Sequence, residues 1–569
     1  MLRGRRMLRR VLIVIAALAV ASASYLAVRR ARERRLKELF SGPCRTVVGK
    51  VGFYPRCGYD LREYEAYEEV GPVPELFLRR PRLRLKWVED VVTGASMPVE
   101  DRLRWRSVYR DRAFSKVLRV TYPQEGALFP LNFCEPSVEW EDEVNEVWQV
   151  EVGVRGTSER WSFFTQKKMW WFPEKLWRKL KERPGRVLWL RVKGTRKGGE
   201  VHASPEVFFE ISPDSVDDYV IYRFVAPQFQ TIETPDMYIR EISSFETRPF
   251  LLARGKYCFS CHTFSSKDGT SGMMSIKVYF MATGGAPLSS LGVLELSSGR
   301  AYKVEVPYPK GFTYMAWDPE GGKLAIAVRE SFISSTPVIH ETQELRFDSS
   351  DIAVYEPSKG TFHLLPGADS PEYVENFPAW SPDGRKLLFS RTRPGVSARL
   401  VRYDVYALDY NDGKGGTPVP VPGASHNGRS NYFARYSPDG RWISFCMADQ
   451  GSLIESSSDI YLMPGDLKGP PHRLESNADY AADSWHSWSS NSKWLVFASK
   501  REDGIYARLY FTHIDEEGRA SPPVRLPVKG EITKSFNIPE LLSDASRLKE
   551  RKLFDAFKLE APAVSVKGE

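Results

Sequence analysis

Apolar and polar residues alternate through much of the chain from about residue 120 onward. The segments 147–152 and 187–192 place an apolar side chain at every second position, and turn residues lie between them. This period of two is typical of strands that bury one face. Residues 174–181 instead carry apolar side chains at helical spacing. The pattern therefore predicts a small β-sandwich over 120–213 that contains one short helix.

An internal repeat begins at about residue 217. An aromatic residue, a turn of the Ser-Pro-Asp-Gly type and an apolar triplet recur in four copies, roughly 50 to 60 residues apart. The aromatic residues of the four copies are Trp317, Trp380, Tyr436 and Trp488. In such a turn proline fixes φ and glycine permits a positive φ, so one strand ends and the next begins. Units of this kind cannot bury their faces alone, and their radial stacking predicts a β-propeller.

The copies resemble the blades of TolB-type propellers, which carry the same aromatic-Ser-Pro-Asp-Gly-Lys turn, and the resemblance covers about 217–530. Residues 264–269 resemble a further copy of the turn, and 219–224 and 237–242 resemble strands of an earlier blade. This resemblance implies six blades. The predicted fold class is mainly β: an N-terminal signal or transmembrane helix, a small β-sandwich and a β-propeller. Residues 531–569 are predicted to form a C-terminal tail.

The motif Cys258-x-x-Cys261-His262 lies near the start of the predicted propeller. Two thiols three positions apart, followed directly by a histidine, form the pattern that receives a covalent c-type haem. Each thiol adds across one vinyl group of the porphyrin, and the imidazole of His262 binds the iron as proximal ligand. A thioredoxin-like redox pair would need a βαβ context, and a zinc site would need more ligands close by. The sequence around the motif offers neither.

The sixth iron position has candidate ligands in the residues that follow the motif. Met273, Met274 and Met281 come soon after it, whereas no histidine occurs between His262 and His340. A thioether opposite His262 gives an electron-transferring haem with a raised potential. We therefore take Met273 and Met274 as candidate distal ligands. The alternatives are a distant histidine, an open site, or methionines that only pack the blade.

The first 40 residues have the pattern of a membrane-targeting segment. An apolar run over 11–28 lies between two arginine-rich flanks and is just long enough to cross a bilayer. The segment is predicted to be an uncleaved anchor or, alternatively, a cleaved export signal, because Ala21-Ser22-Ala23 resembles a cleavage site. Basic residues on both flanks leave the orientation open. Covalent haem attachment takes place outside the cytoplasm, so the bulk of the chain is predicted to be periplasmic, anchored at the inner membrane.

Residues 41–119 are polar and irregular and are predicted to lead from the membrane to the sandwich. In an oxidising compartment, Cys44 and Cys57 are candidates for a disulfide, and Cys134 and Cys446 are either paired or buried as free thiols. The net charge of +9 lies partly at the extreme N-terminus, so the sequence does not predict a nucleic-acid partner.

A small β-domain before a propeller with one haem motif resembles a largely uncharacterised family of exported monohaem propeller cytochromes. The sequence has no nucleophile–base motif and no phosphate loop, which argues against a catalyst. The predicted function is one-electron transfer through one haem c to or from a periplasmic or membrane redox partner. The alternative is a TolB-like binding or assembly propeller whose haem is structural or sensory.

Overall fold

The chain divides into two compact units, Met1–Arg80 and Pro81–Glu569. The computed structural model describes residues 45–49, 52–56, 67–72, 118–196, 199–225, 235–252, 257–280, 288–309, 311–335, 344–396, 400–453, 455, 457–504, 506–530, 532 and 534–548. The first unit has one antiparallel sheet in the order β2-β1-β3. Its strands are β1 (Arg45–Gly49), β2 (Gly52–Arg56) and β3 (Tyr67–Pro72).

The membrane segment predicted at 1–40 lies outside the described residues, as do Cys44 and Cys57. Within the described segments, no helix combines the length and the apolar character that crossing a bilayer requires. The predicted anchor therefore stays a prediction.

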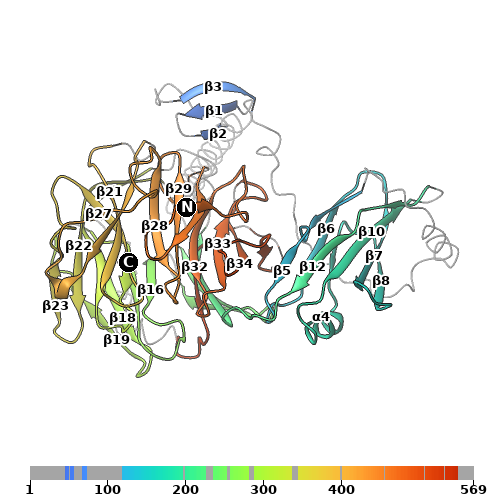
Figure 1. Ribbon diagram of the computed structural model, residues 1–569, viewed down its shortest axis with the longest axis horizontal. Helices are drawn as coiled ribbons and strands as arrows, with labels where there is room; N and C mark the ends of the chain where they lie inside the picture. Colours follow the sequence, from blue (N-terminus) through green and yellow to red (C-terminus); the bar gives the residue numbers. More distant parts are fainter. Residues whose placement is uncertain are drawn as a thin grey trace, which may run out of the picture. The chain divides into compact units, whose positions relative to one another are not determined.

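The second unit begins with a sandwich of two sheets that share one core (Figure 1). The larger sheet has the order β5-β12-β10-β7-β8, with β11 paired to β10, and the smaller is β4-β6-β9. The strands are β4 (Arg119–Tyr122), β5 (Ala127–Phe129), β6 (Ser137–Glu141), β7 (Val147–Val154), β8 (Arg160–Thr165), β9 (Met169–Trp171), β10 (Leu188–Thr195), β11 (His202–Ala203) and β12 (Val207–Ile211). Trp140 and Trp148 link the sheets, with ring centroids 5.8 Å apart.

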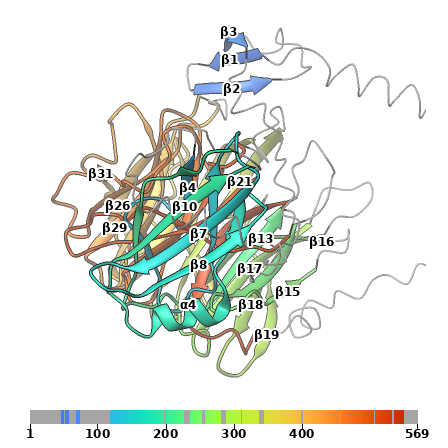
Figure 2. The same cartoon turned by 90° about the vertical axis from the view of Figure 1, so that its right-hand side faces the viewer.

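The sandwich contains one helix, α4 (Glu174–Lys181), which lies at one end of its strands (Figure 2). The helix buries Leu176, Trp177 and Leu180 on one face, as their spacing predicts. The indole of Trp177 donates a hydrogen bond to the carbonyl of Phe133 at 2.8 Å, so this buried ring has its polar atom satisfied.

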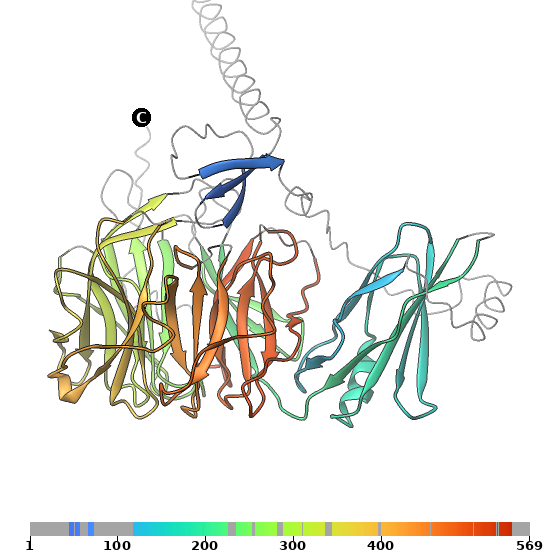
Figure 3. The ribbon, with the colours of Figure 1, turned by 45° about the horizontal axis from the view of Figure 1, so that its top comes forward.

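Six four-stranded sheets follow, and they form the blades of a propeller (Figure 3). We number them blades 1 to 6: β36-β13-β14-β15, β16-β17-β18-β19, β20-β21-β22-β23, β24-β25-β26-β27, β28-β29-β30-β31 and β32-β33-β34-β35. One further residue pair, between β22 and β24, joins blades 3 and 4. The predicted fold class, mainly β with a sandwich and a six-bladed propeller, is confirmed.

The strands of the blades have these bounds: β13 (Tyr219–Val225), β14 (Asp236–Glu241), β15 (Thr247–Leu251), β16 (Tyr257–Phe264), β17 (Met273–Phe280), β18 (Leu288–Glu295), β19 (Arg300–Val304), β20 (Met315–Trp317), β21 (Leu324–Ser335), β22 (Glu344–Glu356), β23 (Thr361–Leu364), β24 (Val374–Trp380), β25 (Lys386–Thr392), β26 (Asp404–Asp409), β27 (Val419–Pro420), β28 (Ser430–Tyr436), β29 (Trp442–Ala448), β30 (Asp459–Pro464), β31 (His472–Arg473), β32 (Asp483–Trp488), β33 (Trp494–Ser499), β34 (Arg508–His513), β35 (Val524–Arg525) and β36 (Ser535–Leu542).

The last strand of the chain closes the propeller. Strand β36 pairs antiparallel with β13, from Tyr219 opposite Leu542 to Val225 opposite Ser535, so blade 1 contains both ends of the propeller sequence. The sequence pattern predicts a tail here, because β36 lacks the repeated turn. All eight of its residues are nevertheless buried. Residues 535–542 are therefore part of the propeller rather than of a tail, and 549–569 lie outside the described residues.

The repeated turn is held by its own side chains. In blade 4 the Ser381 hydroxyl donates to Asp383 at 2.6 Å and accepts from the backbone N–H of Lys386 at 2.9 Å. Gly384 has a φ of 67°, which the turn requires. The recurring Ser-Pro-Asp-Gly sequence is therefore explained by hydrogen bonds within each turn.

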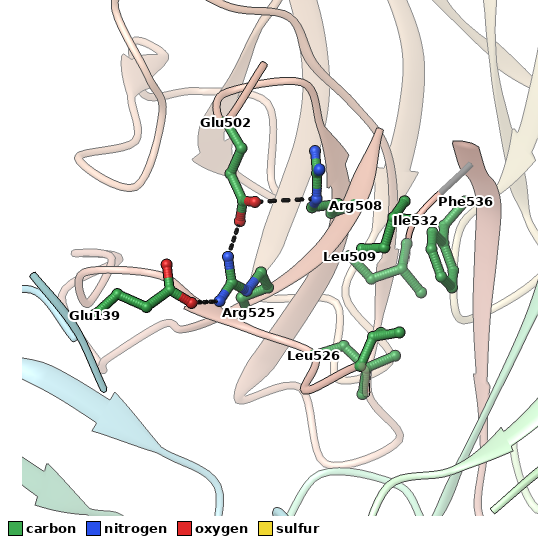
Figure 4. A pocket seen from close by; sticks show the side chains of 9 residues that line it. Glu139, Glu502, Arg508, Leu509, Arg525, Leu526, Ile532 and Phe536 are labelled. Atoms are coloured by element: carbon green, nitrogen blue, oxygen red, sulfur yellow. Dashed lines mark hydrogen bonds and ion pairs between the residues drawn. The ribbon is translucent and has the colours of Figure 1, made fainter. Parts of the chain in front are cut away.

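An ion-pair network joins the sandwich to blade 6 (Figure 4). Arg525 of β35 pairs with Glu139 of β6 on one side and with Glu502 on the other. Arg508 pairs with Glu502 at 3.0 Å and with Asp503 at 2.6 Å. Burial favours the neutral form of Glu502, but Arg525 and Arg508 outweigh it and lower its pKa to about 2. The carboxylate therefore stays ionised, and both arginines remain paired.

Candidate functional site

The inner strands of the blades share a β-bulge at one level. Register shifts occur in β16, β24, β28, β32 and between β13 and β36. The residues with positive φ at four of these bulges are Phe377 (54°), Phe433 (56°), Trp485 (50°) and Ile538 (51°). Phe377, Phe433 and Trp485 each lie three positions before the aromatic residue that begins the turn, as do Cys261 and Tyr314. Ile538 lies three positions before Leu541 in β36, which lacks the turn. A β-bulge interrupts the alternation of side chains between the two faces of a strand and re-aims the bulged side chain. The bulges therefore explain why these side chains meet at the same level of the propeller.

Four aromatic rings close the centre of the propeller at the level of the bulges. Tyr314 packs against Phe377 with centroids 4.3 Å apart, and Phe377 lies 6.1 Å from Phe433. Trp485 completes the ring, at 5.4 Å from Phe433 and 6.2 Å from Tyr314. Cys261 lies at the equivalent position of blade 2 and is 7% exposed. Three of these rings, those of Tyr314, Phe377 and Phe433, line a cavity and form its aromatic floor.

The cavity has a volume of about 150 Å³ and is lined by the inner strands of blades 1 to 5. Cys261 and His262 line it from blade 2, whereas Arg435 and Glu540 line it from blades 5 and 1. The motif predicted from the sequence therefore reaches the central channel. Cys261 and His262, two of the predicted site residues, therefore share this cavity with the charged residues Arg435 and Glu540.

His262 is 3% exposed, and neither of its ring nitrogens has a hydrogen-bond partner among the described residues. Burial is the main cause that lowers the pKa of His262 to about 4, and the opposing effect of Glu540 is smaller. The imidazole is therefore neutral at pH 7. Most buried polar groups have a partner, so an unpartnered imidazole indicates a missing ligand or a functional role.

The two cysteines of the motif lie on strand β16. Cys258 precedes the bulge between Phe259 and His262, and Cys261 lies within it. The Cys261 thiol is free and buried, with the hydroxyl of Ser260 3.8 Å away. Burial raises the pKa of this thiol. The Cα of Cys258 lies opposite that of Tyr279, and its side chain is outside the described part of the structure.

The structure places the candidate distal ligands on β17, away from the cavity lining. Met274 is fully buried in a hydrophobic cluster with Phe264, which is its partner across the strands. Met273 is partly buried and packs against the main core. Neither lines the cavity, whereas Met315 does. Met315 occupies in blade 3 the position that His262 occupies in blade 2, two residues before the aromatic residue of the turn. Aligning the repeats would have identified it.

The donor groups at the cavity fit a covalent haem in their chemistry. A buried thiol and a neutral, unpartnered imidazole are the groups that bind a porphyrin vinyl group and an iron ion. The volume is less favourable, because pockets for organic ligands usually measure about 300–1,000 Å³. The cavity alone does not enclose a porphyrin. Across the described segments, no group of three or more His, Cys, Asp or Glu side chains is arranged to hold a metal ion.

A charged cluster lies beside the imidazole. Glu540 is 1% exposed and accepts hydrogen bonds from Lys267 at 2.5 Å, Arg435 at 2.5 Å and Ser487 at 2.8 Å. Burial alone would raise the pKa of Glu540, but Arg435 and Lys267 outweigh burial and hold it well below its usual value. The sequence gives no local signal for this cluster, because its four members come from four different blades.

No family model matches this chain. A curated relative, the uncharacterized protein Atu1656 of Agrobacterium fabrum, is 25% identical over 195 residues. That match covers 30% of this chain and 62% of the relative, so the chain spans less than two thirds of it.

Solved structures similar to this chain include TolB from Acinetobacter baumannii, at 13% identity and a TM-score of 0.38. That match covers 63% of this chain and 79% of TolB. A Synechocystis apocarotenoid oxygenase is 10% identical with a TM-score of 0.36, over 74% of this chain and 95% of the other. The propeller is established by the strand order rather than by these similarities.

Proposed function

We propose that this chain is an exported monohaem c-type cytochrome in which a β-propeller holds the haem at its central channel. The observation that carries the proposal is His262: a buried, neutral imidazole with both nitrogens unpartnered in the described structure, directly after Cys258-x-x-Cys261. Haem c supplies reversible one-electron chemistry when it is bound. The chain acts as an electron carrier rather than as a catalyst.

Three residues of the motif hold the haem in this proposal. Cys258 and Cys261 would hold the haem through thioether bonds, and the imidazole of His262 would bind its iron. Burial keeps His262 unprotonated at neutral pH, so no proton competes with the metal for the ligating nitrogen. His262 and the aromatic residues Tyr314, Phe377 and Phe433 are buried, which favours a low-dielectric environment on this side of the proposed site.

The distal ligand is a methionine in this proposal. Met273 and Met274 are the candidates from the sequence, and Met315 joins them because it lines the same cavity as His262. The redox partner is a periplasmic or membrane protein, and the segment 1–40 anchors the chain at the inner membrane or directs its export to the periplasm. These assignments follow from the haem motif, since c-type haem is attached outside the cytoplasm.

The test is expression of the full-length chain in a host that attaches c-type haem, followed by oxidised and reduced absorption spectra. We expect covalent haem with sharp reduced bands and a weak near-infrared band from methionine ligation. Separate Met273→Ala, Met274→Ala and Met315→Ala variants identify the distal ligand, because only one of them should lose the near-infrared band.

Two cysteine variants provide the matched comparison. Cys261→Ala should reduce covalent haem attachment, whereas Cys446→Ala should not, although Cys446 is also a buried free thiol. A high-spin spectrum would favour a sensory haem. A protein without haem would contradict the proposal and leave a binding or assembly propeller.

A further inference from the structure

The cavity beside His262 has a small-residue side and a charged side. Thr263, Ala316 and Ala379 line it from blades 2, 3 and 4, and each directly precedes the aromatic residue that begins the turn. Arg435 and Glu540 occupy the corresponding positions of blades 5 and 1. Long side chains at this position reach the channel, so the three short ones leave space between the blades. This asymmetry explains why the cavity exists.

The charges that line the cavity do not cancel. Lys267 and Arg435 contribute two positive charges, and Glu540 contributes one negative charge. The cavity therefore carries an excess of one positive charge. A buried or half-buried charge without a counterion is costly, so a monoanion is the complementary ligand.

Arg435 has N–H groups that are available to bind a ligand. Its Nη1 donates to Glu540, and its guanidinium lies over the ring of Phe433 with its carbon 4.7 Å from the centroid. The described part of the structure provides no hydrogen-bond partner for its other N–H groups. The Nζ of Lys267 already donates to Glu540 and to Ser487. Arg435 is therefore the residue best placed to bind a further anion.

We propose that this cavity binds one carboxylate group on a short apolar body, with Arg435 as the donor and Lys267 as the second cation. A guanidinium suits a carboxylate because its planar N–H groups match the two oxygens. The aromatic floor and the alanines suit an apolar body. The cavity volume of about 150 Å³ lies below the range of pockets for drug-sized ligands, so the ligand is small.

Two sources carry such a carboxylate: a propionate side chain of the haem, and a free short-chain carboxylic acid. The proposed carboxylate site does not depend on the proposed cytochrome function, because the protein forms the cavity and supplies its charged residues without a haem. A phosphate dianion is disfavoured, since two negative charges exceed the single positive excess.

The test is calorimetric titration of the full-length protein, prepared without haem-attachment machinery, with butyrate and with the neutral analogue butyramide. We expect butyrate to bind at least about 10-fold more tightly, because charge-assisted hydrogen bonds contribute a factor of this size. Arg435→Gln should weaken butyrate binding about 10-fold or more. Ala316→Leu, which fills the cavity and leaves the ion pairs intact, should abolish it. Arg473→Gln, at an arginine paired with Asp459, is the control and should leave the affinity unchanged.

The haem-loaded protein distinguishes the two sources. If butyrate binds only the haem-free form, the haem propionate is the natural occupant, and if it binds both forms, the occupant is a free carboxylic acid. Failure of butyrate to bind the haem-free form overturns the proposal. Equal binding of butyramide, or unchanged affinity in both Arg435→Gln and Ala316→Leu, overturns it as well. If the chain takes up no haem, the haem-free titration still decides the carboxylate site, so the two proposals fail separately.

Discussion

Replacing Glu540 by glutamine tests whether the charged cluster stabilises the propeller. The substitution keeps the size of the side chain and removes the negative charge that Lys267 and Arg435 share. Removing one partner of a buried ion pair costs about 3–5 kcal/mol. Lys267 and Arg435 are 21% and 24% exposed in their side chains, so solvent offsets part of this cost. We expect Glu540→Gln to lower the free energy of unfolding by about 2–4 kcal/mol at pH 7.

The contribution of Glu540 to the free energy of unfolding should also depend on pH. The pKa of Glu540 is held below its unfolded-state value of about 4.3, so its contribution is fully present above that pH. As the pH falls below about 4.3, the unfolded chain takes up a proton that the folded chain does not, and the contribution is lost. The difference in stability between the wild type and Glu540→Gln should therefore narrow from pH 5 to pH 2.

Urea unfolding followed by tryptophan fluorescence measures both effects. Glu517→Gln is the matched control, because Glu517 pairs with Arg519 on the surface and is 67% exposed. This control should unfold like the wild type. The reasoning is wrong if Glu540→Gln behaves like Glu517→Gln, or if its deficit stays constant down to pH 2.

Three further predictions concern the packing of the fold. Burial lowers the pKa of His486 to about 3 and that of His262 to about 4, so each should reduce the stability of the haem-free wild type by up to about 1.4 kcal/mol per pH unit below about pH 6.5. His486→Phe should remove its share of this slope in a pH series of urea midpoints, and an unchanged slope would contradict the prediction. Arg525→Ala leaves Glu139 and Glu502 without their shared partner and should speed hydrogen exchange in the sandwich strands; unchanged exchange there would mean that the network does not hold the sandwich. Leu542→Ala removes a fully buried side chain from the closing strand and should cost about 2–5 kcal/mol in thermal or urea unfolding, and a much smaller loss would argue against closure by β36.

The repeat in the sequence predicts the propeller because each copy contains the residues that form its turn. Ser381, Asp383 and Gly384 form the turn through local hydrogen bonds and a positive φ, so a short stretch of sequence is sufficient. Strand β36 is missed for the same reason: its place in blade 1 depends on pairing with β13, which lies more than 300 residues earlier.

The site is only partly predictable. The motif predicts Cys258, Cys261 and His262 as haem-binding residues from spacing alone, and the structure places Cys261 and His262 at the cavity. The cavity depends on the left-handed conformation of residues such as Phe433, which sequence reasoning does not expect outside glycine and asparagine. Glu540 meets Arg435 only after the ring of blades has closed, so long-range pairing decides the electrostatics of the site.

The central claim is that the chain carries one covalent haem at its motif. Intact mass spectrometry under denaturing conditions tests it most directly, with protein from a host that attaches c-type haem. The account predicts that the wild type gains the mass of one haem and that the Cys258→Ala/Cys261→Ala variant keeps the mass of the polypeptide alone. A wild-type protein that has only the polypeptide mass in the same host, while a known c-type cytochrome is loaded there, would contradict the account.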